Sequence, residues 1–176
     1  PLQVEEVRAA GFTLVEGPTT LDALVARLPD FHILHLLAHG SFVDGQSWLH
    51  LEQDDGTWAR CPAALFVDKV GKLTRQPQLI FLAACESAKT SAGASNAFVG
   101  LAPQLVQAGI PAVIAMQEQV TLADAQQLTG NFYRLLLEHG LVDQALNVAR
   151  NLLFRPNSFD WAIPALFMRL RQGRLL

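Results

Sequence analysis

The fold of this 176-residue chain is decided by one stretch, Leu79-Ile80-Phe81-Leu82-Ala83-Ala84-Cys85-Glu86-Ser87. An unbroken apolar run followed by a cysteine and polar residues predicts a buried parallel strand that ends in a thiol. Ligands bind at the carboxyl ends of strands in open α/β sheets. We therefore expect the chemistry of this chain to centre on Cys85.

A second stretch has the same form, Ile33-Leu34-His35-Leu36-Leu37-Ala38-His39-Gly40. It predicts another buried strand, which delivers a histidine and then a glycine. His39 and Cys85 are 85 − 39 = 46 residues apart, enough chain for one crossover between parallel strands. A thiol and an imidazole at one edge of a sheet are the minimum apparatus for nucleophilic catalysis, because the imidazole takes up the thiol proton and returns it to the leaving group.

Gly40 completes the predicted site. A glycine lets the backbone come close to a reacting carbonyl group, so the backbone N–H groups of Gly40 and Cys85 are candidates for an oxyanion hole. A third residue that would orient His39 is not identifiable from the sequence. Without a further constraint, a catalytic pair and a structural coincidence are about equally consistent with the spacing.

The rest of the chain alternates between strand and helix patterns, which predicts an α/β fold with a mainly parallel central sheet and helices on both faces. A small β-hairpin insertion is expected after the His39 loop, from the pattern over residues 48–59. We expect strands over residues 12–15, 33–38, 79–84, 112–116 and 165–170. Helices are expected over residues 2–10, from Thr20 to Pro29, from Pro62 to about Val70, from Phe98 to Gly109, from Thr121 to Gly140, and from Asp143 to Pro156.

Four residues mark predicted helix ends or breaks. Thr121 with Asp124 resembles a capping box, and Gly140 is a typical C-cap. Asp143 is a candidate N-cap for the following helix. Pro103 is expected in the first turn of its helix or at a kink.

Composition limits the classes of function. Apolar residues make up 51% of the chain and charged residues 16%, as in a globular domain with a large core. The net charge is −3 without a basic run, so nucleic acid and anionic membranes are poor expected partners. No apolar run is long enough to span a membrane. Cys61 and Cys85 lie in different contexts, which favours a reducing compartment over a disulfide framework. We expect one domain over residues 1–176, cut from a longer protein and lacking its first strand, since the chain starts at Pro1.

A zinc site is the rival use of the histidines and cysteines, which are His32, His35, His39, His50, Cys61 and Cys85. No Cys-x-x-Cys pair and no helical His-x-x-x-His pair is present. His32 and His35 fall on opposite faces of a strand. No glycine fingerprint for a phosphate occurs either. We therefore expect neither a metal nor a cofactor.

Five segments resemble the CHAT domain family, which is caspase-like and related to separase. They are Leu-Leu-Ala-His39-Gly40-Ser-Phe, Leu-Ala-Ala-Cys85-Glu-Ser, Gly100-Leu-Ala-Pro-Gln-Leu-Val-Gln-Ala-Gly109, Phe132-Tyr133 and Asp160-Trp161-Ala162-Ile163-Pro164. The similarity covers residues 12–170. It implies a caspase-like three-layer sandwich and a Cys–His dyad, with Cys85 as nucleophile and His39 as general acid and base. It also implies a cytoplasmic and usually bacterial signalling or defence protein, with a TPR-type or ATPase-type sensor or activator as partner.

The sequence departs from caspases in ways that bear on specificity. Caspases carry Gln-Ala-Cys at the nucleophile, whereas Ala83 stands at the corresponding glutamine position. The neighbouring loops lack an obvious arginine to receive an aspartate side chain. Acidic residues near strand and helix ends could instead select arginine or lysine in a protein or peptide substrate. The candidates are Glu118, which we prefer, with Glu86 and Asp160; Asp124 is better explained as a helix cap.

Three hypotheses for the function remain open from the sequence. The first is a cysteine endopeptidase that works through a thioester acyl-enzyme. The second is a catalytically silent caspase-like scaffold that binds a partner protein. The third is a different thiol-dependent acyl hydrolase. Residues 88–96, which are small and polar, are expected to form a loop after the thiol that either contacts substrate or merely connects two elements.

Overall fold

The computed structural model describes residues 19–83, 94–118 and 120–176. A four-stranded sheet has the order β1-β5-β6-β7, in which β1 (Ile33–Leu37), β5 (Leu79–Ala83) and β6 (Ala112–Met116) are parallel. The last strand, β7 (Pro164–Met168), runs antiparallel to β6. The three parallel strands confirm the predicted ones to within a residue, because each is an apolar run. The predicted elements over residues 2–10 and 12–15 lie outside the described residues.

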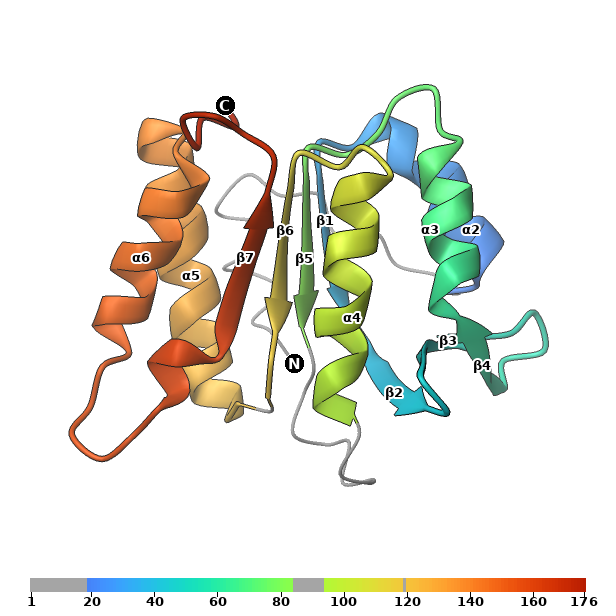
Figure 1. Cartoon of the computed structure of the whole chain (residues 1–176), viewed down its shortest axis with the longest axis horizontal. Helices are drawn as coiled ribbons and strands as arrows, with labels where there is room; N and C mark the ends of the chain where they lie inside the picture. The colour runs from blue at the N-terminus through green and yellow to red at the C-terminus, as the bar shows by residue number, and fades with distance from the viewer. Residues whose placement is uncertain (1–18, 84–93, 119) are drawn as a thin grey trace.

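Helices cover both faces of this central sheet, as predicted (Figure 1). One face packs against α5 (Leu122–His139) and α6 (Val142–Leu152). The other face packs against α2 (Leu21–Arg27), α3 (Ala63–Gly71) and α4 (Ala94–Gln107). Two short 3-10 helices, η1 (Leu28–Asp30) and η2 (Asp160–Ala162), complete the helical elements of the described residues. The arrangement is a mixed α/β sandwich, consistent with a caspase-like fold.

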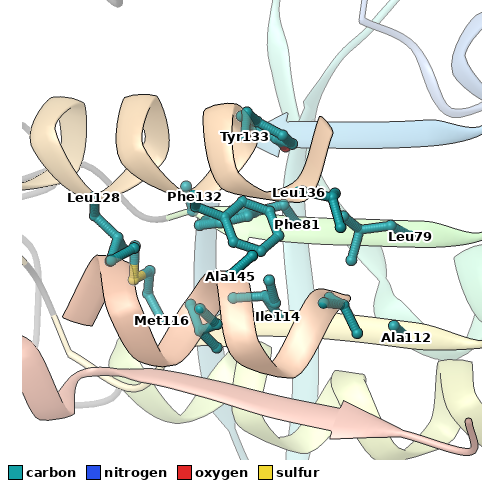
Figure 2. Packing of buried hydrophobic residues seen from close by; sticks show 14 of the residues in the cluster. Leu79, Phe81, Ala112, Ile114, Met116, Leu128, Phe132, Tyr133, Leu136 and Ala145 are labelled. Carbon is teal, nitrogen blue, oxygen red and sulfur yellow. The ribbon is translucent and has the colours of Figure 1, made fainter. Parts of the chain in front are cut away.

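Alternate residues of the central strands supply two separate cores. On β5, Leu79 and Phe81 face α5 and α6, whereas Ile80 and Leu82 face α3 and α4, and all are buried. Figure 2 shows the first core, where side chains of β5 and β6 meet Phe132 and its neighbours on α5. Because both faces are covered, these strands are apolar throughout instead of alternating.

A second sheet, of three antiparallel strands, follows the end of β1. Its order is β2 (His39–Val43), β3 (Gln46–Glu52) and β4 (Trp58–Pro62). The predicted hairpin is β3 and β4. The prediction that His39 lies in a loop is wrong, because β2 begins at this residue and pairs with β3. Leu49 and Leu51 of β3 are buried in the second core, so one face of this sheet packs against the helices.

Most predicted helix ends are confirmed. The hydroxyl oxygens of Thr20 and Thr121 accept from the backbone N–H of Ala23 and Asp124, and Gly140 ends α5 with φ 73°. The prediction for Asp143 is wrong: it lies in the first turn of α6, which has Leu141 as its N-cap and no side-chain cap among the described residues. Pro103 lies inside α4 and not in its first turn, because this helix starts at Ala94, earlier than predicted; a kink at Pro103 stays a prediction.

Candidate active site

The candidate site lies at the carboxyl edge of the central sheet, where β1 and β5 end side by side. Their register pairs Ile33 with Leu79 and continues without a break to Leu37 with Ala83. The backbone N–H of Ala38 then donates to the carbonyl oxygen of Ala83 at 3.2 Å. Each paired residue of β5 is 46 positions after its partner in β1, as in Leu37 and Ala83. This is also the separation of His39 and Cys85 in the sequence.

The chain leaves the central sheet after Leu37, and His39 begins the small sheet. It is the first residue of β2, it is half-buried, and it stands opposite His50 of β3. Its Nδ1 atom is buried and has no hydrogen-bond partner among the described residues. The strand therefore holds the imidazole at the edge of the site through backbone pairing, and a loop is not needed to deliver it.

Cys85 and Glu86 lie outside the described residues, as do residues 88–93 of the predicted polar loop. The expected roles of this thiol and of its backbone N–H stay predictions. For residues 94–96 the loop prediction is wrong, because α4 begins at Ala94.

Gly40 is buried between the small sheet and α4. It pairs with Leu49 of β3, and a Cβ atom on it would lie 3.0 Å from Cβ of Ala97 and 3.3 Å from Cζ of Phe98. The close packing against α4 is thus enough to explain why a glycine stands at position 40. The predicted use of its N–H in an oxyanion hole is neither supported nor contradicted by this packing.

Glu118 and Asp160 lie at the same edge of the central sheet as the ends of β1 and β5. Glu118 is exposed in the bend after β6, and Asp160 opens η2, just before β7 starts. Because Met116 pairs with Pro164, these two segments come together: the backbone N–H of Gln117 donates to the carbonyl oxygen of Ile163 at 3.0 Å. The structure therefore places both residues at the carboxyl edge of the central sheet, and their role in specificity stays a prediction.

The two carboxylates differ in how they are held. The Asp160 carboxylate accepts a hydrogen bond from the Ser158 hydroxyl, whose oxygen in turn accepts from the backbone N–H of Asp160. Glu118 is followed by Gln119, which lies outside the described residues. The Asp160 carboxylate is thus already hydrogen-bonded within its own turn. The exposed Glu118 is better placed to contact a ligand.

Asp124 has a structural role, as expected. It is 3% exposed, accepts from the Thr121 hydroxyl at 2.7 Å, and pairs with Arg155 at 2.7 Å. The ion pair fastens the segment after α6 to the start of α5. Asp124 is therefore unavailable to a substrate.

His35 and His32 lie in separate environments, away from His39. His35 Nδ1 is 2.9 Å from the Tyr133 hydroxyl, and its ring stacks on Phe81 with centroids 4.6 Å apart. Burial lowers the pKa of His35 to about 4, and burial likewise raises the pKa of Tyr133. His32 lies 2.9 Å from Arg75 instead. The described residues contain no group of three His, Cys, Asp or Glu side chains that could hold a metal ion.

The polar neighbours of His39 were not predicted from the sequence. The Ser41 hydroxyl lies 3.0 Å from Nε2 of His50, and Arg60 stands opposite His50 on β4. The missed signal is Asp44-Gly45, a dipeptide typical of two-residue hairpin turns. Both residues have positive φ, 51° and 77°, and join Val43 to its partner Gln46. That turn sets the register that brings His39 opposite His50.

The model of the CHAT domain family matches residues 3–170, which is nearly the whole chain. Among curated proteins, none matches the chain. No helix of the described residues has both the length and the apolar character needed to cross a membrane.

Proposed function

The chain belongs to the CHAT domain family, which is related to the caspase-like cysteine peptidases, and on this premise we propose that it is a cysteine endopeptidase with a Cys85–His39 dyad. One observation carries the proposal. The unbroken register of β1 and β5 has the same 46-residue offset as His39 and Cys85, so two equivalent strand ends lead to the two residues. Parallel strands in register deliver equivalent positions to one edge of a sheet.

The proposed reaction proceeds in two steps. His39 takes the proton from the Cys85 thiol, and the thiolate attacks the carbonyl carbon of the scissile peptide bond. His39 then gives this proton to the departing amine, which leaves a thioester on Cys85. In the second step, water attacks the thioester and His39 carries its proton to the thiolate. The backbone N–H groups of Gly40 and Cys85 are proposed to bind the oxyanion in both steps.

The proposed substrate is a protein or peptide with arginine or lysine before the cleaved bond. Glu118 supports this, because it is exposed and lies at the carboxyl edge of the sheet beside η2. Glu86 and Asp160 are the alternative partners for the basic side chain, and Asp160 is already bonded to Ser158. A charged pair of this kind favours one residue type over others through hydrogen bonds to the guanidinium or ammonium group.

The proposed setting is a longer cytoplasmic protein of a bacterial signalling or defence system, in which residues 1–176 form the effector domain. A sensor or activator of the TPR or ATPase type would switch the peptidase on. The net charge of −3 supports a protein partner over nucleic acid.

The test is covalent labelling by peptide acyloxymethyl ketones that carry Arg, Lys, Asp or Leu next to the reactive group. We expect label with Arg or Lys in the parent protein, and no label in Cys85→Ala or His39→Ala. Cys61→Ala is the matched control and should label like the parent. Glu118→Gln should slow labelling by the Arg reagent about tenfold and leave the Leu reagent unchanged.

Three outcomes would contradict parts of this proposal. Label that persists in Cys85→Ala and disappears in Cys61→Ala would mean that the wrong thiol was chosen. Preference for the Asp reagent would overturn the proposed specificity alone. A parent protein that takes no label, with candidate activators present, would favour the silent scaffold that binds a partner protein.

A further inference from the structure

Three side chains form a row across the outer face of the small sheet. His39 of β2 stands opposite His50 of β3, and His50 stands opposite Arg60 of β4. Directly opposed residues of antiparallel strands project on the same side of a sheet, with Cβ atoms about 5 Å apart. The opposite face of this sheet is closed by Leu49 and Leu51 in the core. The row therefore lies on the face that the core does not use.

His50 is held in the middle of the row. Its Nε2 atom lies 3.0 Å from the Ser41 hydroxyl, which comes from the same strand as His39. Burial, and then the charges of Arg60 and His39, lower the pKa of His50. The remaining charged group on this face of β3 is Glu52, which accepts a hydrogen bond from the backbone N–H of Thr19 at 3.0 Å.

The row is electrostatically asymmetric. Two opposed imidazoles repel each other when both are protonated, so only one of them readily carries a charge. Arg60 is permanently charged and lies next to His50, but it is two strand spacings, or about 10 Å, from His39. Its repulsion therefore falls mainly on His50. His50 is therefore the member of the row on which a proton is least favourable.

We propose that His50 is a positioning residue for the reaction at His39: an uncharged partner, held by Ser41, that leaves His39 as the proton acceptor of the row. This inference rests on the proposed function, since it assigns His39 the proton of Cys85. His50 itself touches neither substrate nor thiol in this scheme. It keeps a second positive charge away from the imidazole that must become charged.

The first test follows proton uptake directly, by NMR titration of the histidine ring signals. The chain has five histidines, so each signal can be assigned by replacing one residue at a time. We expect Arg60→Gln and His39→Gln each to raise the pH at which His50 is protonated, toward the ordinary value of 6.5. Arg75→Gln, next to His32, is the matched control and should leave His50 unchanged. An unchanged His50 in both variants would overturn the proposal.

The second test compares labelling by the peptide ketones in two variants of His50. His50→Gln keeps an uncharged hydrogen-bonding group and should label at nearly the parental rate. His50→Lys places a fixed charge opposite His39, and we expect labelling at pH 7 to slow about tenfold. Adding Arg60→Glu to His50→Lys should recover part of that loss. Equal slowing in His50→Gln and His50→Lys would reveal a packing role only and would overturn the proposal.

The two tests also separate this inference from the proposed function. Label in the parent protein without any coupling of His50 to Arg60 and His39 overturns the role of His50 alone. A parent protein that takes no label overturns the dyad and, with it, the role of His50 in the reaction.

Discussion

The two sheets of this domain differ in how far their two faces are buried. In the central sheet every residue of β5 and β6 is buried, because helices cover both sides. In the small sheet Leu49 and Leu51 are buried, whereas their neighbours on β3 are half-buried or exposed. The comparison shows that the central sheet provides the framework. The small sheet provides a face outside the core on which polar and titratable groups gather beside the edge of that framework.

The largest expected effect breaks the central sheet. Phe81→Ala removes a fully buried ring that packs on Phe132 and stacks on His35. We expect the free energy of unfolding to fall by about 4 kcal/mol, from lost burial and the cavity that remains. Phe42→Ala is the matched control in the small sheet, where the phenylalanine is 39% exposed, and it should cost less than about 1 kcal/mol. Urea denaturation followed by circular dichroism measures both. Equal losses would show that the small sheet is as tightly packed as the central one.

The next effect concerns pH and the titratable group of the central sheet. The folded protein binds a proton on His35 only near pH 4, whereas the unfolded chain does so near 6.5. The contribution of the neutral ring to stability is therefore complete above pH 6.5 and is lost as the pH falls from 6.5 to about 4. At 1.36 kcal/mol per pH unit, this amounts to about 3 kcal/mol.

His35→Phe tests this pH dependence, since it keeps a ring on Phe81 and cannot bind a proton. The variant loses the contact with the Tyr133 hydroxyl, so its stability at pH 7 is expected to be lower. Its decline between pH 6.5 and 4 should be shallower than that of the parent protein. His50→Gln, in the small sheet, should flatten the decline less than His35→Phe does, because the pKa of His50 is lowered by a smaller amount. A parental slope in His35→Phe would show that other groups cause the acid sensitivity.

The smallest effect lies where the two sheets meet through α4. Gly40→Ala puts a methyl group 3.0 Å from Ala97, so β2 or α4 must shift. We expect a loss of about 1–2 kcal/mol in the free energy of unfolding, and slower ketone labelling because His39 is the preceding residue. Gly100→Ala is the matched control: among the described residues its Cβ meets the Ser47 hydroxyl, at 3.0 Å, and that side chain can rotate. Because Gly100 lies inside α4, alanine should leave the free energy of unfolding unchanged or raise it by up to about 1 kcal/mol. A Gly40→Ala protein as stable as the parent would contradict this close packing.

Much of the framework could be predicted because its signals are local. The strands β1, β5 and β6 are apolar runs, and the helix ends at Thr20, Thr121 and Gly140 carry residue types that cap helices wherever they occur. The same logic predicts His39 and Cys85 at matching strand ends. The register of β1 and β5 runs to Leu37 and Ala83, and the position of Cys85 beyond it stays a prediction.

The remainder depends on pairing between segments. Strand β2 contains Gly40 and Ser41, which break an apolar pattern, so only its partner β3 reveals that it is a strand. Asp143 has the residue type of a cap. The N-cap position of α6 is nevertheless occupied by Leu141, because α6 begins immediately after Gly140, the residue that ends α5. The row from His39 to Arg60 arises from two hairpin registers, and no local pattern in the sequence contains it.

The turn at Asp54-Asp55-Gly56, between β3 and β4, has a consequence for how such a domain changes over evolution. Among the residues that the structure describes, nothing lies within 4 Å of the position where a Cβ atom on Gly56 would stand, and the turn is exposed. Extra residues in this turn would not change the register between β1 and β5. Deletion of one residue inside β1 would turn its later side chains to the opposite face and move His39 out of line. Length variation among descendants of this chain should therefore accumulate at the hairpin tip, while the number of residues in β1 stays constant.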